Sequence, residues 1–456
     1  MSNHVFCKEG SAIESNFVNT IAEIKVREMR LTPQITLRYL PMSTPKGNYL
    51  SLRFLTPLDE FTSANALLPY VLARGSVDYP DVELIDQTAD LLYGAEITPM
   101  VGSEGEWQVI GFSASFLADR MAPDGCPILE GVIKLLSSLL LNPLRTDRLL
   151  RADFVDSEKE KLCDRLRSLK DNPDLYAIKR SEELMCQGEA YARYERGDEK
   201  EVARLTSESL TQAWERLITT SPLVITYGGD CDEANLCDLL CRYFGKLQQS
   251  PLPLPPTQII RQARSPLRRF EERLHNSQCQ LIIGLRSGSV HSDADHAAFS
   301  LFFALLSSSP TSRLFTKIRE ERSLCYSCSA LSDSHKGILL ITCGLSRNRL
   351  QEAEKAILHQ LDELANGAFS EEEFQSAKRW LMGRYPILED SPIALAGWYF
   401  SRSPLILGDS PRTEAAKIDA LTPEDVMRAA QKLSLDTVYT LLDGSRFQKE
   451  VQCNAD

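Results

Sequence analysis

The chain has 456 residues, too many for one ordinary core, so we expect two large domains or three small ones, and we favour two. Its hydrophobic residues (43%) and charged residues (25%) are typical of a folded protein. Its formal net charge of −12 disfavours nonspecific binding to nucleic acid or to an anionic membrane surface, because both are polyanions. The amino-terminal sequence MSNHVFCKEG lacks the apolar segment of a secretory signal, and no stretch has the roughly 18 apolar residues that span a bilayer, so we expect a cytoplasmic protein.

The first half of the sequence predicts an α/β unit in which paired strands lead into helices. Residues 97–116 are predicted to form two strands, residues 126–141 an apolar helix, and residues 147–169 a long charged helix. Thr206 has the features of an N-cap residue, because an amphipathic helix follows it. An apolar strand ending at Gly228 completes the unit.

Residues 246–269 interrupt these patterns with five prolines and then four arginines. Such a composition is typical of an extended linker, because proline ends both helices and strands. We therefore predict an amino-terminal domain over residues 1–245 and a carboxy-terminal domain over residues 270–456.

The second half repeats the order of the first. Paired strands at residues 326–345 lead into an apolar helix at residues 350–365 and a charged helix at residues 370–385. Thr422 then precedes a helix and a strand that ends before Gly444, with the same spacing as in the first half. We predict an α+β protein made of two tandem copies of one unit, each an antiparallel-rich sheet packed against helices.

Histidine, which most acid/base and zinc sites need, is scarce in this sequence. There are six histidines, and the predicted first domain holds none except His4, so it cannot supply two histidine ligands to zinc. The other five are His275, His291, His296, His335 and His359. We expect His291 and His296 in a solvated loop or at a helix start, and we expect no second ligand beside His335 or His359.

The twelve cysteines are spread along a chain without a secretory signal, so we expect reduced and mostly buried thiols. Cys325 and Cys328 form a CxxC motif, a spacing that can bind zinc or carry out redox exchange. The motif falls in a predicted strand, where residues three apart point to opposite faces. We therefore predict no site at these two cysteines.

Residues 65–97 resemble the region of insulinase/pitrilysin peptidases that carries the inverted zinc motif HxxEH, followed by a glycine, a short helix and a Gly-Ala turn. The motif positions hold Ala66, Pro69 and Tyr70 in this chain. The resemblance therefore implies that both histidine ligands and the glutamate that activates water are absent. We also expect Pro69 to disturb the first turns of the helix that carries the motif.

Downstream, the sequence FVDSEKEKLCDRL at residues 154–166 resembles the helix from which this family draws its third zinc ligand. Glu158 stands at the matching position. Without the other ligands it is no evidence for a metal, and we interpret Glu158 as a helix-surface carboxylate near Lys159 and Lys161.

Residues 307–331 match the same family more closely, with a small-residue loop, a helix containing RLF and IREER, and a strand that opens LxYS. In that family an arginine and a tyrosine seven residues apart hold the substrate carbonyl near the metal, and Arg319 and Tyr326 have this spacing. The alternative is that Arg319 belongs to a solvated charged face and that Tyr326 packs as an ordinary strand aromatic.

The resemblance implies two homologous metalloprotease-like domains joined by the linker into a half-clamshell. It further implies the inactive, HxxEH-lacking subunit of a bacterial heterodimeric pair, in which the HxxEH-bearing partner holds zinc and this chain holds no cofactor. An unfolded peptide would bind between the subunits, with Arg319 and Tyr326 completing the active site of the partner. Two alternatives stay open, a purely structural or assembly subunit and a homodimeric peptide-binding protein.

Overall fold

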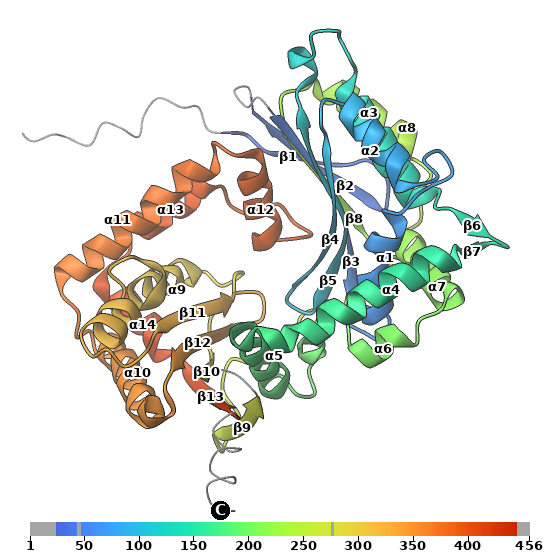
Figure 1. Cartoon of the computed structure of the whole chain (residues 1–456). Helices are drawn as coiled ribbons and strands as arrows, with labels where there is room; N and C mark the ends of the chain where they lie inside the picture. Colours follow the sequence, from blue (N-terminus) through green and yellow to red (C-terminus); the bar gives the residue numbers. More distant parts are fainter. Residues whose placement is uncertain (1–23, 43–46, 275–277, 445–456) are drawn as a thin grey trace, which may run out of the picture.

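The computed structural model describes residues 24–42, 47–274 and 278–444. Two lobes lie side by side, each built on one β-sheet with helices packed against it (Figure 1). His4 with the amino-terminal sequence around it, and His275, lie outside the described residues. In the described part of the chain, no helix is both long enough and apolar enough to cross a membrane.

The first lobe is built on a six-stranded sheet with the strand order β1-β2-β8-β3-β5-β4. Only β2 and β8 are parallel neighbours in it. The strands of this half are β1 (Arg27–Arg30), β2 (Ile35–Pro41), β3 (Gly47–Pro57), β4 (Glu96–Glu104), β5 (Trp107–Leu117), β8 (Leu223–Gly229), and the short pair β6 (Arg145–Thr146) and β7 (Leu149–Leu150). The helices are α1 (Thr62–Leu72), α2 (Val82–Leu91), α3 (Ile128–Leu141), α4 (Ala152–Arg167), α5 (Pro173–Met185), α6 (Glu199–Ala203), α7 (Ser207–Thr220) and α8 (Glu233–Phe244), with short 3-10 turns η1 (Asp119–Met121), η2 (Ser168–Asp171) and η3 (Ala190–Ala192).

The second lobe is built on a five-stranded sheet with the strand order β11-β12-β10-β13-β9, in which only β13 and β9 are parallel neighbours. The strands are β9 (Arg268–Leu274), β10 (Cys279–Arg286), β11 (Ser327–Asp333), β12 (Ile338–Leu345) and β13 (Ser434–Asp443). The helices are α9 (His296–Phe303), α10 (Leu350–Ala365), α11 (Glu371–Leu388), α12 (Pro392–Arg402), α13 (Pro411–Asp419) and α14 (Pro423–Gln431), with π-helical turns η4 (Ala304–Ser308) and η5 (Leu314–Glu320) and a 3-10 turn η6 (Arg347–Arg349).

The two sheets share one topology. The strands β2, β8, β3, β5 and β4 correspond in order to β9, β13, β10, β12 and β11, and the parallel pair takes the same place in both sheets. Each sheet ends on an edge strand, β4 or β11, that belongs to a hairpin predicted from the sequence. The predicted α+β fold and its two copies of one unit are therefore confirmed.

Side-chain alternation along the strands gives the second sheet two buried faces. On one face, Leu281 and Ile283 of β10 belong to a core shared with α9, α10 and α14 of the same half. Ile282 points to the opposite face, where Ala177 and Met185 of α5 pack against it. Since α5 belongs to the first half of the chain, one face of the second sheet is covered by the other half.

The first sheet has the reciprocal arrangement. Leu395 and Tyr399 of α12 pack against Leu40 and Tyr49 of this sheet, although α12 belongs to the second half. Figure 1 shows both crossings, with green α5 against the strands of the second lobe and orange α12 beside the first sheet. The halves thus exchange one helix each, which we call the helix exchange.

The predicted linker, residues 246–269, forms no helix or strand until β9 begins at Arg268, two residues inside the predicted range. The segment is fixed to the first lobe, where the indole Nε1 of Trp107 donates a hydrogen bond of 2.7 Å to the Pro255 carbonyl. The domain limits stay a prediction, because the helix exchange carries an element of each half into the other lobe.

A buried ionic network joins the two halves. Lys336 lies fully buried in the β11–β12 turn, with its Nζ 2.5 Å from Glu106 Oε1 in the β4–β5 turn and 2.7 Å from Glu189 Oε2. Glu189 also contacts the fully buried Arg286 at 2.8 Å, and Arg286 Nε lies 3.0 Å from an Asp436 carboxylate oxygen. Burial opposes the charge of Glu189, but its hydrogen bonds with Arg286 and Lys336 outweigh this and lower the pKa of its carboxyl.

Candidate functional site

The helix α1 carries the three positions that correspond to the histidines and the glutamate of HxxEH. Ala66 and Pro69 are buried and Tyr70 is half-buried, and none of the three offers a histidine nitrogen, a thiolate or a carboxylate. The guanidinium of Arg165 lies 4.2 Å from the centre of the Tyr70 ring, and Arg196 lines a cavity of about 40 Å³ beside Ala66 and Tyr70. Two arginines where a cation would need ligands make these residues unfit for zinc.

The expectation that Pro69 disturbs the first turns of this helix is wrong. α1 runs unbroken over Thr62–Leu72, and Pro69 stands in its second half. A proline removes only its own N–H, which would have bonded to the carbonyl of Asn65 four residues earlier. The helix continues past this point, since the N–H of Ala73 donates a hydrogen bond of 3.0 Å to the Pro69 carbonyl.

Glu158 of α4 is 5% exposed, so its interpretation as a helix-surface carboxylate is wrong. The reason is that α4 packs against α1 and encloses the carboxylate. Lys161 Nζ lies 2.7 Å from Glu158 Oε1 and Arg74 Nε lies 3.8 Å from the same oxygen, whereas Lys159 pairs with Asp156 instead. Glu158 is thus already paired with two cations, which leaves its charge compensated without a metal.

Arg319 and Tyr326 lie in the second lobe, at the end of η5 and directly before β11. Tyr326 is 63% exposed, so it does not pack as an ordinary strand aromatic, and its backbone N–H donates a hydrogen bond of 2.8 Å to the Gly344 carbonyl. Arg319 is half-exposed, with its Nε 3.7 Å from Glu320 and its guanidinium 5.2 Å from the centre of the Phe315 ring. Both side chains are open to a molecule outside this chain.

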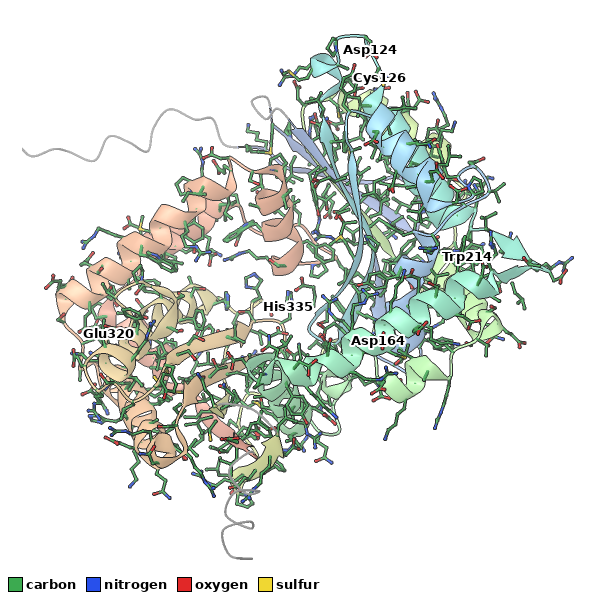
Figure 2. All side chains as sticks on the ribbon, viewed as in Figure 1. Asp124, Cys126, Asp164, Trp214, Glu320 and His335 are labelled. Carbon is green, nitrogen blue, oxygen red and sulfur yellow. The ribbon has the colours of Figure 1, made fainter. Side chains whose placement is uncertain are left out.

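The structure places these residues apart from the positions on α1. Figure 2 shows Glu320, the neighbour of Arg319, on the side of the second lobe that is turned away from the first. The α1 positions belong to the first lobe (Figure 1). The chain therefore keeps its two sets of predicted site residues on different lobes.

Three histidines that were predicted to form no site come together. The ring centres of His291 and His296 lie 4.4 Å apart, and those of His291 and His335 lie 5.9 Å apart. Figure 2 shows His335 where the two lobes meet, and its Nε2 lies 3.2 Å from the carboxylate of Glu104 in the first lobe. With Arg402, the three histidines line a pocket of about 590 Å³.

His296 begins α9, which is the predicted helix start, but its side chain is buried, with only 6% of its surface exposed. Burial lowers the pKa of His291 to about 2 and that of His296 to about 4, and the charge of Arg402 acts in the same direction. Neither Nδ1 atom has a hydrogen-bond partner among the described residues. For His335 burial also opposes the charge, but hydrogen bonding to Glu104 outweighs it and raises the pKa.

These lowered pKa values predict a loss of stability in mild acid. A histidine whose pKa is lowered in the folded state binds its proton more readily in the unfolded state. Its contribution to the free energy of unfolding is therefore lost as the pH falls below about 6.5, the pKa of histidine in the unfolded chain. Between pH 7 and pH 4 the free energy of unfolding should fall less in His296→Gln than in the wild type, by about 2 to 3 kcal/mol. The measurement is urea unfolding at a series of pH values.

The matched control is His359→Gln, which replaces an exposed histidine on α10. It should leave the pH profile of the wild type unchanged. His335 and Glu104 have raised pKa values and titrate with the opposite sign, but both variants retain them, so the comparison isolates His296. Parallel pH profiles for wild type and His296→Gln would contradict the prediction.

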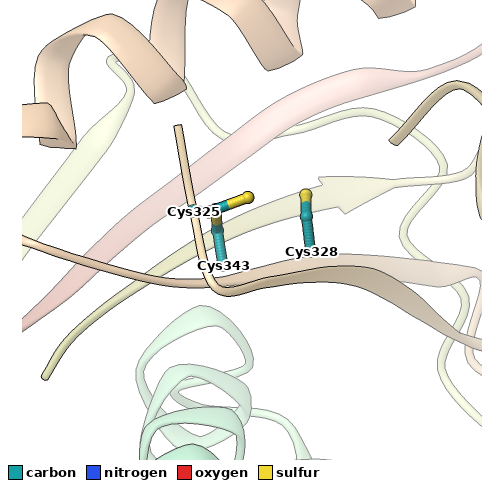
Figure 3. Close-up of side chains that lie close together, drawn as sticks. All are labelled: Cys325, Cys328 and Cys343. Atoms are coloured by element: carbon teal, nitrogen blue, oxygen red, sulfur yellow. The ribbon is translucent and has the colours of Figure 1, made fainter. Parts of the chain in front are cut away.

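The CxxC motif does not have its two cysteines on opposite faces, and that prediction is wrong. The strand β11 begins only at Ser327, so Cys325 lies before it and is free of strand alternation, while Cys328 faces Cys343 across the pairing with β12. The three Sγ atoms lie within 4.8 Å of one another, and Figure 3 shows their side chains gathered together. Within the described ranges, no other set of three His, Cys, Asp or Glu ligand atoms is spaced so closely.

All ten cysteines in the described part of the chain are free thiols. The expectation that they are mostly buried is wrong, since only four of the ten are fully buried. Cys343 is one of these four, while Cys325 and Cys328 keep part of their surface exposed.

Comparisons with known proteins find similar sequences. A family model described as the peptidase M16 inactive domain matches residues 204–381, the region that contains Arg319 and Tyr326. The chain is 27% identical over 425 residues to YmfF of Bacillus subtilis, named a probable inactive metalloprotease, and the alignment covers 92% of this chain and 98% of that protein. The predicted resemblance to this peptidase family is confirmed.

Solved structures show the same fold. A conserved protein from Enterococcus faecalis is 22% identical, with a TM-score of 0.82 over 91% of this chain and 98% of that one. A peptidase M16 inactive domain from Pseudomonas fluorescens is 20% identical, with a TM-score of 0.76 over 92% of this chain and 98% of that one. Residues 204–381 therefore match the peptidase M16 inactive domain, and the chain as a whole is a homologue of a probable inactive metalloprotease and shares the fold of these structures.

Proposed function

We propose that this chain is the non-catalytic subunit of a heterodimeric zinc metallopeptidase of the cytoplasm. It binds an unfolded peptide together with an HxxEH-bearing partner subunit, and that partner holds the zinc. The observation that carries the proposal is the exposure of Tyr326, which leaves 63% of an aromatic side chain open to solvent just before an edge strand. A large side chain with little packing in its own fold is available to another molecule.

The chemistry of the exposed pair suits a peptide bond. In the proposed complex Arg319 and Tyr326 donate hydrogen bonds to the substrate carbonyl as it becomes an oxyanion. Arg319 lies on a π-helical turn, a kind of turn that is often found at functional sites. The guanidinium also contributes a positive charge that is retained at every physiological pH.

Peptide binding is supported by the edge of the first sheet. Among the strands of the described residues, none lies beyond β4, so its outer backbone groups can pair with an extended peptide. A pocket of about 380 Å³ runs beside β4, lined by Met100 and Val101 of that strand and by Tyr70 of α1. Pro99 supplies no N–H at one point along the strand, which restricts the register that a peptide can take.

Mixing experiments test the proposal. The purified chain is assayed for peptide cleavage and bound zinc alone, then with an HxxEH-bearing M16 chain from the same organism. We expect cleavage of an unfolded peptide only in the mixture, with the catalytic zinc bound to the partner. Cleavage and tightly bound catalytic zinc in this chain alone would refute the proposal.

The same experiment separates the two alternatives. A structural subunit would assemble with the partner, but Arg319→Ala and Tyr326→Phe would leave cleavage unchanged. A homodimeric peptide-binding protein would show the mass of two copies of this chain and no association with the partner. The exposed Tyr326 favours the peptidase role over both.

A further inference from the structure

We propose that Cys325, Cys328 and Cys343 form a binding site for a thiolate-seeking divalent cation, with Zn²⁺ as the expected occupant. Zinc binds cysteine sulfur at about 2.3 Å with tetrahedral angles, which places two sulfur ligands about 3.8 Å apart. The three Sγ atoms already lie within 4.8 Å of one another, so closing them around an ion needs only small side-chain rotations. The site lies in the second lobe, away from the zinc-motif positions on α1.

The donor set selects for soft metals. All three ligands are sulfur, and thiolates prefer zinc and its soft neighbours over magnesium or calcium, which take oxygen ligands. Cys343 is fully buried beneath the helices of the second lobe, whereas Cys325 and Cys328 are partly exposed. The exposed side leaves a fourth coordination position that water can fill.

Charge favours a divalent ion over a monovalent one. Binding removes a proton from each of the three thiols to the surrounding water, so the site contributes three negative charges. A Zn²⁺ ion reduces this to one, and Arg319, whose charge acts on Cys325, compensates the charge that remains. A monovalent ion such as Cu⁺ would leave one more negative charge uncompensated in a half-buried position.

Ordinary packing does not account for the arrangement. A buried cysteine acts as a small apolar side chain, and Cys343 fits that role in the core of the second lobe. Cys325, outside the strand, also packs against this core, but packing alone does not require its sulfur to lie within 4.8 Å of both other sulfurs. Convergence from three backbone positions on two neighbouring segments is the geometry of a ligand set.

A bound ion would connect the backbone just before Tyr326 to β12. Cys325 adjoins Tyr326 in the sequence, and Cys343 lies in the neighbouring strand. The inference does not depend on the proposed peptidase role, because metal binding is measured on this chain alone.

The test is a Zn²⁺ titration of the reduced, full-length chain against a chromophoric chelator, with Co²⁺ as a spectroscopic substitute. We expect one Zn²⁺ per chain, and a Co²⁺ complex with the intense near-ultraviolet absorption of thiolate ligation. Cys325→Ser and Cys328→Ser should each weaken binding by at least about tenfold. Cys241→Ser, at an exposed cysteine outside the cluster, is the matched control and should bind as the wild type does.

Alkylation gives a second measurement that needs no variant. Zn²⁺ should protect Cys325 and Cys328 from iodoacetamide while Cys241 stays reactive, as read by peptide mass spectrometry. His296→Gln checks the histidine pocket and should bind Zn²⁺ normally. The proposal is overturned by unchanged binding in both cluster variants, by binding of Cu⁺ but not Zn²⁺, or by a disulfide within the cluster of the freshly isolated chain.

Discussion

Replacing Glu189 with alanine is expected to lower the free energy of unfolding by about 3 to 5 kcal/mol, because it removes one partner from a buried ionic network. The Glu189 carboxylate is almost fully buried and contacts both Arg286 and Lys336, whose side chains have no exposed surface. Without the Glu189 carboxylate, Arg286 and Lys336 stay buried with less negative charge nearby to compensate their positive charges. Urea unfolding of the purified variant at pH 7 measures the loss.

Two controls define the cause of this effect. Glu199→Ala removes a carboxylate whose partner Arg167 is exposed, and it should cost less than about 1 kcal/mol. Glu189→Gln keeps the size of the side chain but removes its charge, and it should lie between Glu189→Ala and the wild type. A loss for Glu189→Ala no larger than that for Glu199→Ala would show that the network does not stabilise the junction of the halves.

Replacing Arg319 with alanine is expected to lower kcat of the mixed peptidase by about 10²- to 10³-fold, the usual effect of losing one oxyanion donor. Tyr326→Phe removes only the hydroxyl and should lower kcat in the same direction by a smaller factor. Because both side chains are exposed in this chain, neither change should affect its folding. Steady-state cleavage of an unfolded peptide by the mixed complex is the measurement.

The matched control for this prediction is Arg322→Ala, three residues further along the same charged segment and also exposed. It should leave kcat within about twofold of the wild type, since surface charges away from the reacting carbonyl contribute little. The catalytic zinc content of the partner and the assembly of the two subunits should be the same for all variants. Equal rates for Arg319→Ala and Arg322→Ala would contradict the assignment of Arg319 to the active site.

The repeat could be predicted from the sequence because it is local. Thr206 and Thr422 each begin a helix with a reciprocal capping box, and each helix leads into the strand that forms the parallel pair of its sheet. The hairpins that contain the edge strands are also contiguous in the chain. The helix exchange could not be predicted, because an amphipathic helix does not reveal which of two sheets it covers.

In the candidate sites, too, the features that depend on local sequence could be predicted, and those that depend on packing between distant segments could not. The loss of zinc ligands is visible at Ala66 and Tyr70 in the sequence itself, whereas the burial of Glu158 depends on how α4 packs against α1. Cys343 stands 15 residues after Cys328, and only the register of β11 with β12 brings them face to face. The contact between the rings of His335 and His291 likewise forms because a turn packs against a loop, and no pattern in the sequence predicts that packing.

The helix exchange bears on how a chain of this kind could have arisen. Each half places one helix, α5 or α12, against the sheet of the other half. A single copy of the unit on its own would therefore leave one face of its sheet uncovered. A chain of half this length could cover that face only by pairing with a second, identical copy that lends the same helix in return. Fusion of such a twofold pair into one gene would free the two halves to diverge.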